Sequence, residues 1–598
     1  MAGKGHRVFY ISNNFVDSAT PGFAVEALDQ NGRLFQVNLH VAGAPQIYFD
    51  VASPEQVEAI QASLAVLLQW TSTIAAISLV QHPFWLVPAQ SLPNMRLVYD
   101  CMDHHGGFED NAASVLAGER TLVESADLLI VTSQWLLEEM EGKSSNIAMI
   151  RNATEYAHFC DRPTEVFVDP EGRRIIGYYG AIAEWFDPDL IRRVAEDHPH
   201  ELVLLVGRDT AGVQETLQGL SNVRFTGEVP YRELPYWLHA FDVCLLPFKV
   251  IPLTLATNPV KVYEYLSAGK PTVSVDLPEM AQFEGLVNLA TEPDAFSSAV
   301  SLALQPAAVA VDEVEARQAF ARQQTWDHRA SDLDGALEGI VEPKVSIIVL
   351  CYNNLPYTQA CLHSLDQYSD YPNLEIIAVD NASSDGSVEY LSEWAEGAEN
   401  RIFIANADNL GFSAGNNVGL RAATGEYLVV LNNDTYVTPG WVRGLVRHLK
   451  RNPAVGLVGP VTNNIGNEAR IEINYASMEE MIQRAGEYTR KHPGQSFEMK
   501  TAAFFCVMIS RQAYEAVGPM DEDFGVGFFE DDDYCRRLAL NGFDVRCADD
   551  VFVHHHLSAS FNALKADTKQ ILFEKNKKIY ESKWGPWVPH VYRDRTPR

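Results

Sequence analysis

The sequence lacks any arrangement of cysteines that would indicate a metal ribbon or a disulfide framework. Its eight cysteines are scattered, and no two of them have CxxC spacing. A zinc ribbon needs closely spaced thiolates, and a disulfide framework needs a recognisable set of pairs. Neither kind of scaffold is indicated. The cysteines lie at positions 101, 160, 244, 351, 361, 506, 535 and 547.

Positive charge is also scarce. The chain has 46 Lys and Arg against 79 Asp and Glu, which gives a formal net charge of -33. The phosphates of a nucleic acid would be repelled by such a chain. Simple electrostatic docking on anionic lipid is disfavoured for the same reason, although a local basic patch is still compatible with it. We therefore expect no nucleic-acid partner.

Long apolar runs are missing as well. The most apolar stretch, residues 60–80, is interrupted by Gln61, Gln69, Trp70 and a Thr-Ser-Thr break. This pattern predicts a helix followed by a strand rather than a transmembrane segment. The first residues, MAGKGHRVFY, lack the apolar core of a signal peptide. We expect a soluble protein in the reducing cytoplasm.

What the chain does contain is a regular alternation of short apolar runs with polar or amphipathic segments. Its 598 residues suggest roughly three to five domains at about 100–200 residues each. Strands that alternate with helices are typical of a parallel, doubly wound α/β sheet. We predict two such Rossmann-like halves facing one cleft, residues 1–165 and 166–340, with a linker at 152–170. The expected strands are 7–12, 75–80, 96–100 and 128–132 in the first half, and runs beginning at 174, 201, 223, 243 and 271 in the second.

The second half carries a resemblance. The run NPVKVYEYLSAGKPTVS, residues 258–274, resembles the nucleotide-sugar site of family 4-like glycosyltransferases, which have the GT-B fold. The resemblance implies that Glu264 holds the ribose hydroxyls of the donor. It also implies that the helix N-terminus near Lys261 faces the diphosphate, where free N–H groups favour an anion.

Two loops extend this resemblance. GYYGAIAEWFD, residues 177–187, matches the glycine-containing loop of the family, and LVYDCMDHHGGF, residues 97–108, matches its acceptor-side loop. Asp103 and His104 in the second loop are the implied catalytic candidates. The chain departs from the family pattern at Ala256, where a second glutamate is usual, and at residues 184–186, where a basic residue is expected.

A further unit is predicted from residue 344 to 598. Within it, the apolar run 427–431 reads as a buried strand that leads into Asn432, Asn433 and Asp434. A carboxylate at the carboxyl end of a central strand lies where open α/β sheets bind ligands. An oxygen-rich edge suits Mg²⁺ or Mn²⁺ shared with the phosphates of a substrate.

Four motifs in order resemble family 2 glycosyltransferases of the GT-A fold, over roughly residues 345–587. They are VSIIVLCYNN (345–354), EIIAVDNASSDGS (375–387), NADNLGFSAGNNVGL (406–420) and LNNDTYV (431–437). The resemblance implies that Cys351, Tyr352, Asn353 and Asp380 grip the base and ribose. A carboxylate that accepts from the base N3–H favours uracil or thymine over cytosine.

The same resemblance implies the metal site and its neighbours. Asp434 is the expected metal ligand, and Asn432 stands where the first acid of the usual DxD motif would be. Asn432 and Asn433 are expected to contact the donor. In VFVHHHLSASF, residues 551–561, the register against Ser558 and Ser560 favours His555 as the second ligand, with His554 the alternative. Three adjacent histidines on a strand cannot all face one metal, because alternate side chains point to opposite faces.

A last motif supplies the candidate base. GVGFFEDDDYCRRL, residues 525–538, matches the ED motif of the family, and Asp531 is the implied general base. Neighbouring carboxylates raise one another's pKa, which suits proton abstraction. The alternative for Glu530, Asp532 and Asp533 is that they position acceptor hydroxyls.

Together these features predict a bifunctional glycosyltransferase, with a GT-B unit followed by a metal-dependent, inverting GT-A unit. The expected donors are dTDP-rhamnose or UDP-sugars, and the expected acceptor is a bacterial surface polysaccharide or lipid-linked oligosaccharide. That acceptor would place the protein in the cytoplasm, at most peripheral to the membrane. The alternative is one active GT-A enzyme joined to a non-catalytic GT-B module that binds carbohydrate or a partner.

Overall fold

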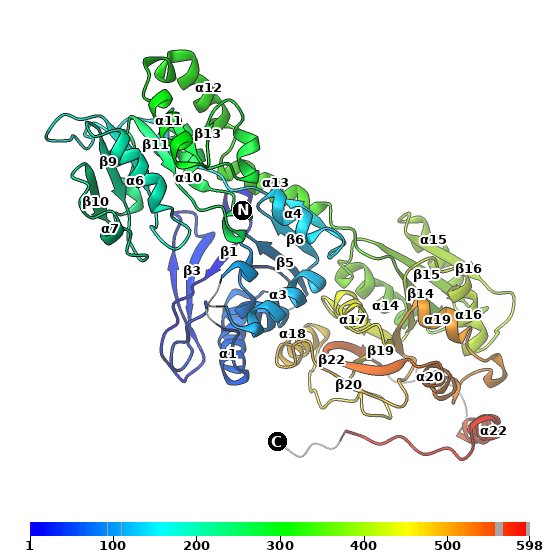
Figure 1. Cartoon of the computed structure of the whole chain (residues 1–598). Helices are drawn as coiled ribbons and strands as arrows, with labels where there is room; N and C mark the ends of the chain where they lie inside the picture. The colour runs from blue at the N-terminus through cyan, green and yellow to red at the C-terminus, as the bar shows by residue number, and fades with distance from the viewer. Residues whose placement is uncertain (49, 74, 93, 109–110, 557–565, 594–598) are drawn as a thin grey trace.

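The computed structural model describes residues 1–48, 50–73, 75–92, 94–108, 111–556 and 566–593. Within them the chain forms three consecutive α/β units, which run from blue through green to red in Figure 1. The six-stranded and four-stranded sheets are parallel, and the nine-stranded sheet contains a run of parallel strands. The α/β class expected from the sequence is therefore confirmed.

The first unit holds two sheets rather than the single parallel sheet expected. Four strands pair in parallel in the order β4-β5-β6-β7. Strand β1, however, pairs with β3, and β3 pairs with β2 in antiparallel fashion. The β2–β3 turn is closed locally by Asp29, whose Oδ1 accepts hydrogen bonds from the N–H groups of Arg33 and Leu34. The strands are β1 (Val8–Ile11), β2 (Phe23–Ala27), β3 (Leu34–Leu39), β4 (Ala76–Val80), β5 (Met95–Cys101), β6 (Leu128–Val131) and β7 (Ile147–Met149).

Helix α1 (Pro54–Thr71) fills the most apolar stretch of the sequence and leads into β4, as predicted. It begins with a capping box, in which the side chains of Ser53 and Gln56 each accept a hydrogen bond from the other residue's backbone N–H. Among the described residues, no helix is both long and apolar enough to cross a membrane. The other helices here are α2 (Leu86–Gln90), α3 (Ala113–Ser125), α4 (Gln134–Met140) and α5 (Tyr156–Cys160).

The second unit is one parallel sheet in the order β10-β9-β8-β11-β12-β13. Its central strands are apolar on both faces, as expected where helices cover both sides of a parallel sheet. Its last helix, α13 (Trp326–Glu338), returns to the first unit, where Leu333 and Leu337 pack with Val98 and Leu128. The strands are β8 (Ile175–Tyr179), β9 (Leu202–Val206), β10 (Val223–Gly227), β11 (Val243–Leu246), β12 (Thr272–Ser274) and β13 (Asn288–Leu289). The other helices are α6 (Pro188–Asp197), α7 (Val213–Thr216), α8 (Leu234–Leu238), α9 (Pro252–Leu255), α10 (Val260–Ser267), α11 (Pro293–Ala303) and α12 (Val311–Arg322).

The third unit is a nine-stranded mixed sheet. Parallel strands β16, β15, β14 and β17 form one half, and β21, β19, β22, β18 and β20 complete it. The strands are β14 (Val345–Cys351), β15 (Leu374–Asp380), β16 (Arg401–Ala405), β17 (Tyr427–Asn432), β18 (Thr435–Val437), β19 (Val455–Val461), β20 (Ser496–Glu498), β21 (Cys506–Ser510) and β22 (Asp544–His555). The helices are α14 (Leu355–Tyr368), α15 (Ser387–Glu396), α16 (Phe412–Ala422), α17 (Trp441–Arg451), α18 (Met478–Thr489), α19 (Arg511–Val517), α20 (Glu530–Leu540) and α22 (Ala566–Trp584).

Helix α17 joins the third unit to the first. Arg443 on this helix is buried, its guanidinium bonds to the buried Glu342 carboxylate, and its Nε donates to Asn94 Oδ1 at 3.2 Å. Arg96 lies 3.5 Å from the same carboxylate. The short linker between the units is therefore held by a buried ion pair.

Candidate functional site

The carboxyl ends of three neighbouring strands in the third unit bring the predicted donor residues to one edge of the sheet. Cys351 at the end of β14 is in register with Asp380 at the end of β15. On the other side of β14, Leu350 is in register with Asn432 at the end of β17. This edge is where an open parallel sheet binds ligands.

Asp380 leaves a buried hydrogen-bond acceptor at this edge. The residue is fully buried, and its Oδ2 accepts a hydrogen bond from the N–H of Ser383 at 2.8 Å. Its Oδ1 is buried too and has no partner among the described residues. Leaving a buried carboxylate oxygen without a donor is costly. The site is therefore suited to a ligand that brings an N–H or O–H group.

The Tyr352–Asn353 turn lies next to Asp380 and is fixed by hydrogen bonds of Asn353. The Asn353 N–H donates to Ser383 Oγ at 2.7 Å, and its Oδ1 accepts from the N–H of Ser384 at 2.9 Å. Tyr352 is 40% exposed, so its ring is available to a ligand. Cys351 is different, because its thiol is fully buried and bonds to the Val349 carbonyl. The Cys351 thiol is therefore not available to a ligand, and the Cys351 carbonyl accepts the N–H of Asn381 at 2.8 Å.

The side chains of the two asparagines before Asp434 differ in burial. Asn433 is buried, and its amide donates to Thr358 Oγ1 on α14 at 2.9 Å. Its side chain therefore supports the fold of the turn. Asn432 is half-buried at the end of β17. Of the pair, Asn432 has the more accessible side chain.

Asp434 and His555 are brought together by the pairing of β18 with β22. Their Oδ1 and Nε2 atoms lie 3.4 Å apart, and both side chains are buried. His555 Nδ1 lies 3.0 Å from the Asn464 carbonyl, which can only accept, so Nδ1 carries the proton in the neutral ring. Nε2 then presents a lone pair toward the carboxylate. A hydrogen bond from the other ring nitrogen to a carbonyl is what usually orients a metal-binding histidine.

These two donors fit a hard divalent ion that is shared with a substrate. The described residues contain no group of three or more His, Cys, Asp or Glu placed to hold a metal. Mg²⁺ is commonly bound by one or two protein ligands together with substrate phosphates and water. The donor set thus matches a shared ion better than a closed structural metal site.

The other two histidines of the motif have separate partners. His554 Nδ1 contacts the Tyr475 hydroxyl at 2.5 Å, and its Nε2 lies 3.2 Å from His556 Nδ1. Burial and the two neighbouring imidazoles lower the pKa of His554 to about 3. His554, the alternative ligand considered from sequence, is therefore neutral and turned toward Tyr475.

The acid run at the start of α20 divides into residues with different partners. Asp533 bonds to Arg537, Lys583 and the Trp584 indole, and Asp532 accepts from Thr501 Oγ1 at 3.1 Å. Asp531 is half-buried, and its Oδ1 accepts the N–H of Asp532 at 2.9 Å. Asp532 and Asp533 are thus engaged in holding the structure together.

Burial and the adjacent Asp532 raise the pKa of Asp531 to about 7. Glu530 is more deeply buried, and burial together with Asp531 raises its pKa well above the usual range. A carboxyl group whose pKa lies near 7 can accept a proton and release it again at neutral pH. Asp531 has the properties that a general base requires.

The turn before α20 is supported by residues of α22 and of the segment after it that were not predicted from the sequence. Asn576 is fully buried and donates to backbone carbonyls just before α20, Lys583 and Trp584 contact Asp533, and His590 Nε2 lies 3.4 Å from Asp532. No motif marks these residues, and more than 40 positions separate Asn576 from the turn that it contacts. Only the packing of α22 reveals them.

In the second unit, the predicted ribose-binding residue Glu264 is already bonded within the protein. Its Oε2 accepts from the Tyr179 hydroxyl at 2.7 Å, and burial raises its pKa. Lys261, one turn earlier on α10, packs its side chain over Gly180, where a Cβ would lie 2.0 Å from Lys261 Cε. Burial lowers the pKa of Lys261, and Glu264 partly offsets that effect. The structure thus brings the Lys261–Glu264 pair and the glycine loop together.

The acceptor-side loop of the first unit reaches the second. A Cβ on Gly107 would lie 3.3 Å from the backbone of Leu253 on α9. His104 packs on the Trp135 ring with centroids 4.9 Å apart, and its buried Nδ1 has no partner in the described part of the chain. Burial raises the pKa of Asp103 and lowers that of His104. At neutral pH His104 is therefore an uncharged imidazole.

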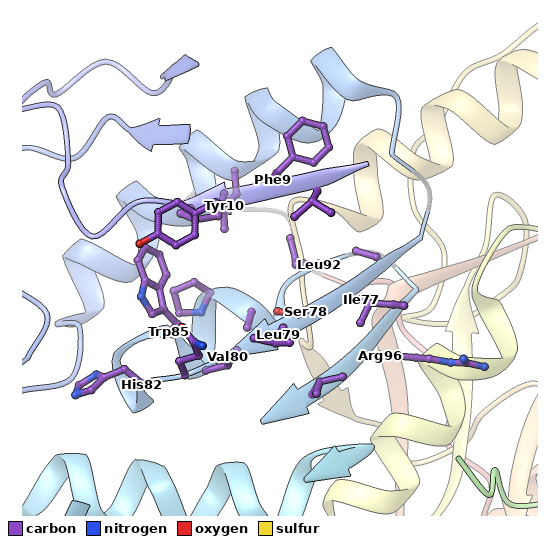
Figure 2. Close-up of a pocket in the computed structure, with 18 of the residues that line it drawn as sticks. Phe9, Tyr10, Ile77, Ser78, Leu79, Val80, His82, Trp85, Leu92 and Arg96 are labelled. Atoms are coloured by element: carbon purple, nitrogen blue, oxygen red, sulfur yellow. The ribbon is translucent and has the colours of Figure 1, made fainter. Parts of the chain in front are cut away.

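A cavity of about 1270 Å³ borders this loop. Figure 2 shows β1, carrying Phe9 and Tyr10, on one side of it and β4, carrying Ile77 and Leu79, on the other. The space exists because β1 pairs with β3 and leaves the edge of β4 uncovered. Asp103 is among its lining residues, so the mainly apolar space meets a polar group at the loop.

Two family models match the chain. Glycosyl transferases group 1 matches residues 174–305, and Glycosyl transferase family 2 matches residues 346–518. The chain therefore carries a group 1 glycosyltransferase region followed by a family 2 domain. This confirms the two resemblances drawn from the sequence motifs.

The curated relatives match parts of the chain. TuaH of Bacillus subtilis is provisionally named a teichuronic acid biosynthesis glycosyltransferase. It is 26% identical over 209 residues, which are 32% of this chain and 52% of that protein. Glycosyltransferase AglE of Haloferax volcanii is 26% identical over 216 residues, which are 36% and 67% of the two chains. The chain spans about half of the first relative and under a third of the next two.

Among solved structures, sucrose-phosphate synthase from Thermosynechococcus elongatus aligns with a TM-score of 0.44 and 16% identity. The alignment covers 56% of this chain and 90% of that one. Likeness at this level supports no conclusion about substrate.

Proposed function

We propose that a chain with this pair of glycosyltransferase regions is a bifunctional enzyme, and that residues 344–598 transfer a sugar from a nucleoside-diphosphate donor to an acceptor hydroxyl. The observation that carries this proposal is the approach of Asp434 Oδ1 to His555 Nε2, which lie 3.4 Å apart. Two acceptors that face each other in a buried site are stabilised by a cation between them. This pair lies beside the strand edge that ends in Asp380 and Asn432.

Asp434 and His555 would hold Mg²⁺ or Mn²⁺ with the phosphates of the donor. The ion would supply Lewis-acid stabilisation of the negative charge on the leaving diphosphate. Donor binding and removal of the acceptor proton are assigned to side chains of the third unit.

Asp380 would bind the nucleoside, because its buried Oδ1 needs a donor such as a base N3–H or a ribose hydroxyl. A base N3–H would favour uracil or thymine, in keeping with UDP-sugars or dTDP-rhamnose as donors. Tyr352 would lie against the base through its exposed ring. These contacts would fix the donor before chemistry begins.

Asp531 would act as the general base. The acceptor oxygen attacks the anomeric carbon in line, its proton passes to the Asp531 carboxylate, and the bond from the anomeric carbon to the diphosphate breaks. A single displacement of this kind inverts the anomeric configuration. Its raised pKa makes Asp531 a stronger base than an ordinary aspartate and still leaves a useful ionised fraction near neutral pH.

The acceptor is proposed to be a bacterial surface polysaccharide or a lipid-linked oligosaccharide at the cytoplasmic face of the membrane. The relation to a teichuronic acid glycosyltransferase supports the polysaccharide class. The cavity between β1 and β4 offers room for the apolar part of a lipid-linked acceptor next to Asp103. In the bifunctional enzyme, residues 1–340 would add a second sugar, with Lys261 and Glu264 on the donor and Asp103 and His104 on the acceptor.

A second candidate is that residues 1–340 bind carbohydrate or a partner without catalysis. The observation that favours it is the bond between Tyr179 and Glu264, which occupies the carboxylate expected to hold the donor ribose. A ribose would have to compete with this buried hydrogen bond. The GT-B unit would then serve as a docking module for the active GT-A unit.

Two variants of the full-length protein distinguish the bifunctional enzyme from the enzyme with a docking module. Asp434→Ala should abolish transfer by the third unit, and Glu264→Ala should strongly reduce transfer by residues 1–340. Each protein is incubated with a panel of nucleotide sugars and the released nucleoside diphosphate is measured. Activity with one donor in each variant supports two enzymes, and full loss in Asp434→Ala alone supports the docking module. Full activity in Asp434→Ala would refute the role of the third unit.

A further inference from the structure

Helix α22 encloses the turn that precedes the acid run, although the family 2 match ends at residue 518. Asn576 on this helix is fully buried, and its Nδ2 donates to the carbonyl of Phe524 at 2.6 Å. The same amide donates to the carbonyls of Gly527 at 2.7 Å and Phe528 at 3.3 Å. One side-chain amide thus donates hydrogen bonds to three carbonyls of a single turn.

That turn has an unfavourable backbone conformation. Phe528 and Phe529 are consecutive non-glycine residues with φ of 72° and 74°. A left-handed conformation is disfavoured for a side chain that carries a Cβ, and two in succession persist only when the surroundings hold them. Such strain is typical of sites where a functional group must be presented in one orientation.

Aromatic side chains of α22 and of the segment after it also stabilise this turn. The Phe573 ring lies 5.6 Å from the Phe528 ring and 5.1 Å from the Phe529 ring, measured between centroids. Trp587, just beyond the helix, lies 5.2 Å from Phe529. Polar and aromatic contacts from the same segment therefore converge on the two strained residues.

The turn leads directly into the acids. Phe529 is the N-terminal cap of α20, and the helix begins at Glu530, one residue before Asp531. The direction of the Asp531 carboxylate is consequently set by the backbone that Asn576 holds. Asp532 and Asp533 have partners of their own in His590, Lys583 and Trp584.

We propose that Asn576 is a positioning residue for the transfer reaction, acting through the Phe524–Phe529 turn to aim the Asp531 carboxylate at the acceptor hydroxyl. This inference rests on the proposed role of Asp531. It extends the machinery of the third unit from the acid run at the start of α20 to α22.

The test is a kinetic comparison of full-length variants. Asn576→Ala removes all three hydrogen bonds, and a misplacement of about 1 Å can lower turnover on the order of 10²-fold. We expect kcat to fall by that order while the KM for the donor changes little, because Asp380 and Asp434 lie on other elements. Asn576→Ser keeps a hydroxyl donor on a shorter side chain, which can serve at most one of the three carbonyls, and should fall in between. Asn541→Ala, at the opposite end of α20, is the matched control and should behave as the wild type.

A double variant decides whether the effect passes through Asp531. If it does, adding Asn576→Ala to Asp531→Asn causes little further loss, because residues that act as one unit are not additive. An equal loss in both backgrounds, or an equal rise in donor KM, would overturn the proposal. Thermal unfolding of each variant identifies a protein that has lost its fold, and Asn576→Ser then supplies the comparison. A wild-type protein without transferase activity would refute the proposed function instead.

Discussion

Replacement of Asp531 by asparagine removes the proposed base with little change in shape. The Asp531 Oδ1 atom accepts the N–H of Asp532 at 2.9 Å, and an asparagine side chain can accept the same hydrogen bond. The start of α20 should therefore keep its structure. What is lost is the ability to take the proton of the acceptor hydroxyl.

The expected loss of kcat follows from the proposed role of Asp531 as the general base. General base catalysis contributes about 10²–10⁴-fold, so kcat should fall by that factor, which corresponds to about 3–5 kcal/mol of transition-state stabilisation. Donor affinity should hardly change, because the contacts proposed for Asp380 and Asp434 remain. Asp523→Asn, an exposed acid on the preceding turn, is the matched control.

The pH dependence provides a second readout. Burial and Asp532 raise the pKa of Asp531 to about 7, and the base works only when it is ionised. Activity should therefore be lost as the pH falls through about 7, with a decrease of about tenfold between about pH 8 and about pH 6. The Asp531→Asn variant should lose this limb of the profile.

The assay is release of nucleoside diphosphate under steady state, with NMR of the product anomer. Inversion supports direct attack assisted by one base. A product with retained configuration, or an Asp531→Asn enzyme near the wild-type rate, would refute the assignment. Glu530 and Asp532 would then be the next candidates.

The remaining predictions concern the proposed metal, the donor site around Glu264 and the buried ion pair of Arg443. Chelation with EDTA should abolish transfer by the third unit and leave transfer by residues 1–340 unaffected, and Asp434→Ala should weaken donor binding measured by calorimetry; full activity in chelator would contradict the shared metal. Glu264→Ala should weaken donor binding to residues 1–340 by about 1.5–3 kcal/mol if its carboxylate holds the ribose, whereas unchanged affinity in calorimetry favours the docking module. Arg443→Met should lower the unfolding free energy by about 3 kcal/mol, near the lower end for breaking a buried pair, because Arg96 still faces Glu342. Denaturant unfolding measures this loss, and an unchanged midpoint would show that the pair does not hold the units together.

Much of the architecture followed from local pattern. Continuous apolar runs such as those of β14 and β17 predicted buried parallel strands, because a parallel sheet is covered on both faces. The first unit deviated, since β1 pairs with β3 and leaves the cavity beside β4. Which edge a short strand chooses is decided by long-range packing, which its own residues do not record.

The sequence by itself determined the order of the units, the two glycosyltransferase resemblances and the chemical types at the site. Those depend on residue identity and on spacing along a strand or turn, which are properties of the local chain. Only the tertiary structure decided which of these side chains are available. It joined Asp434 to His555 through the pairing of β18 with β22, turned Asn433 toward Thr358, and placed Asn576 on a turn about 50 residues away. Such contacts join segments far apart in the chain, and their geometry is set by packing of the whole unit rather than by any motif.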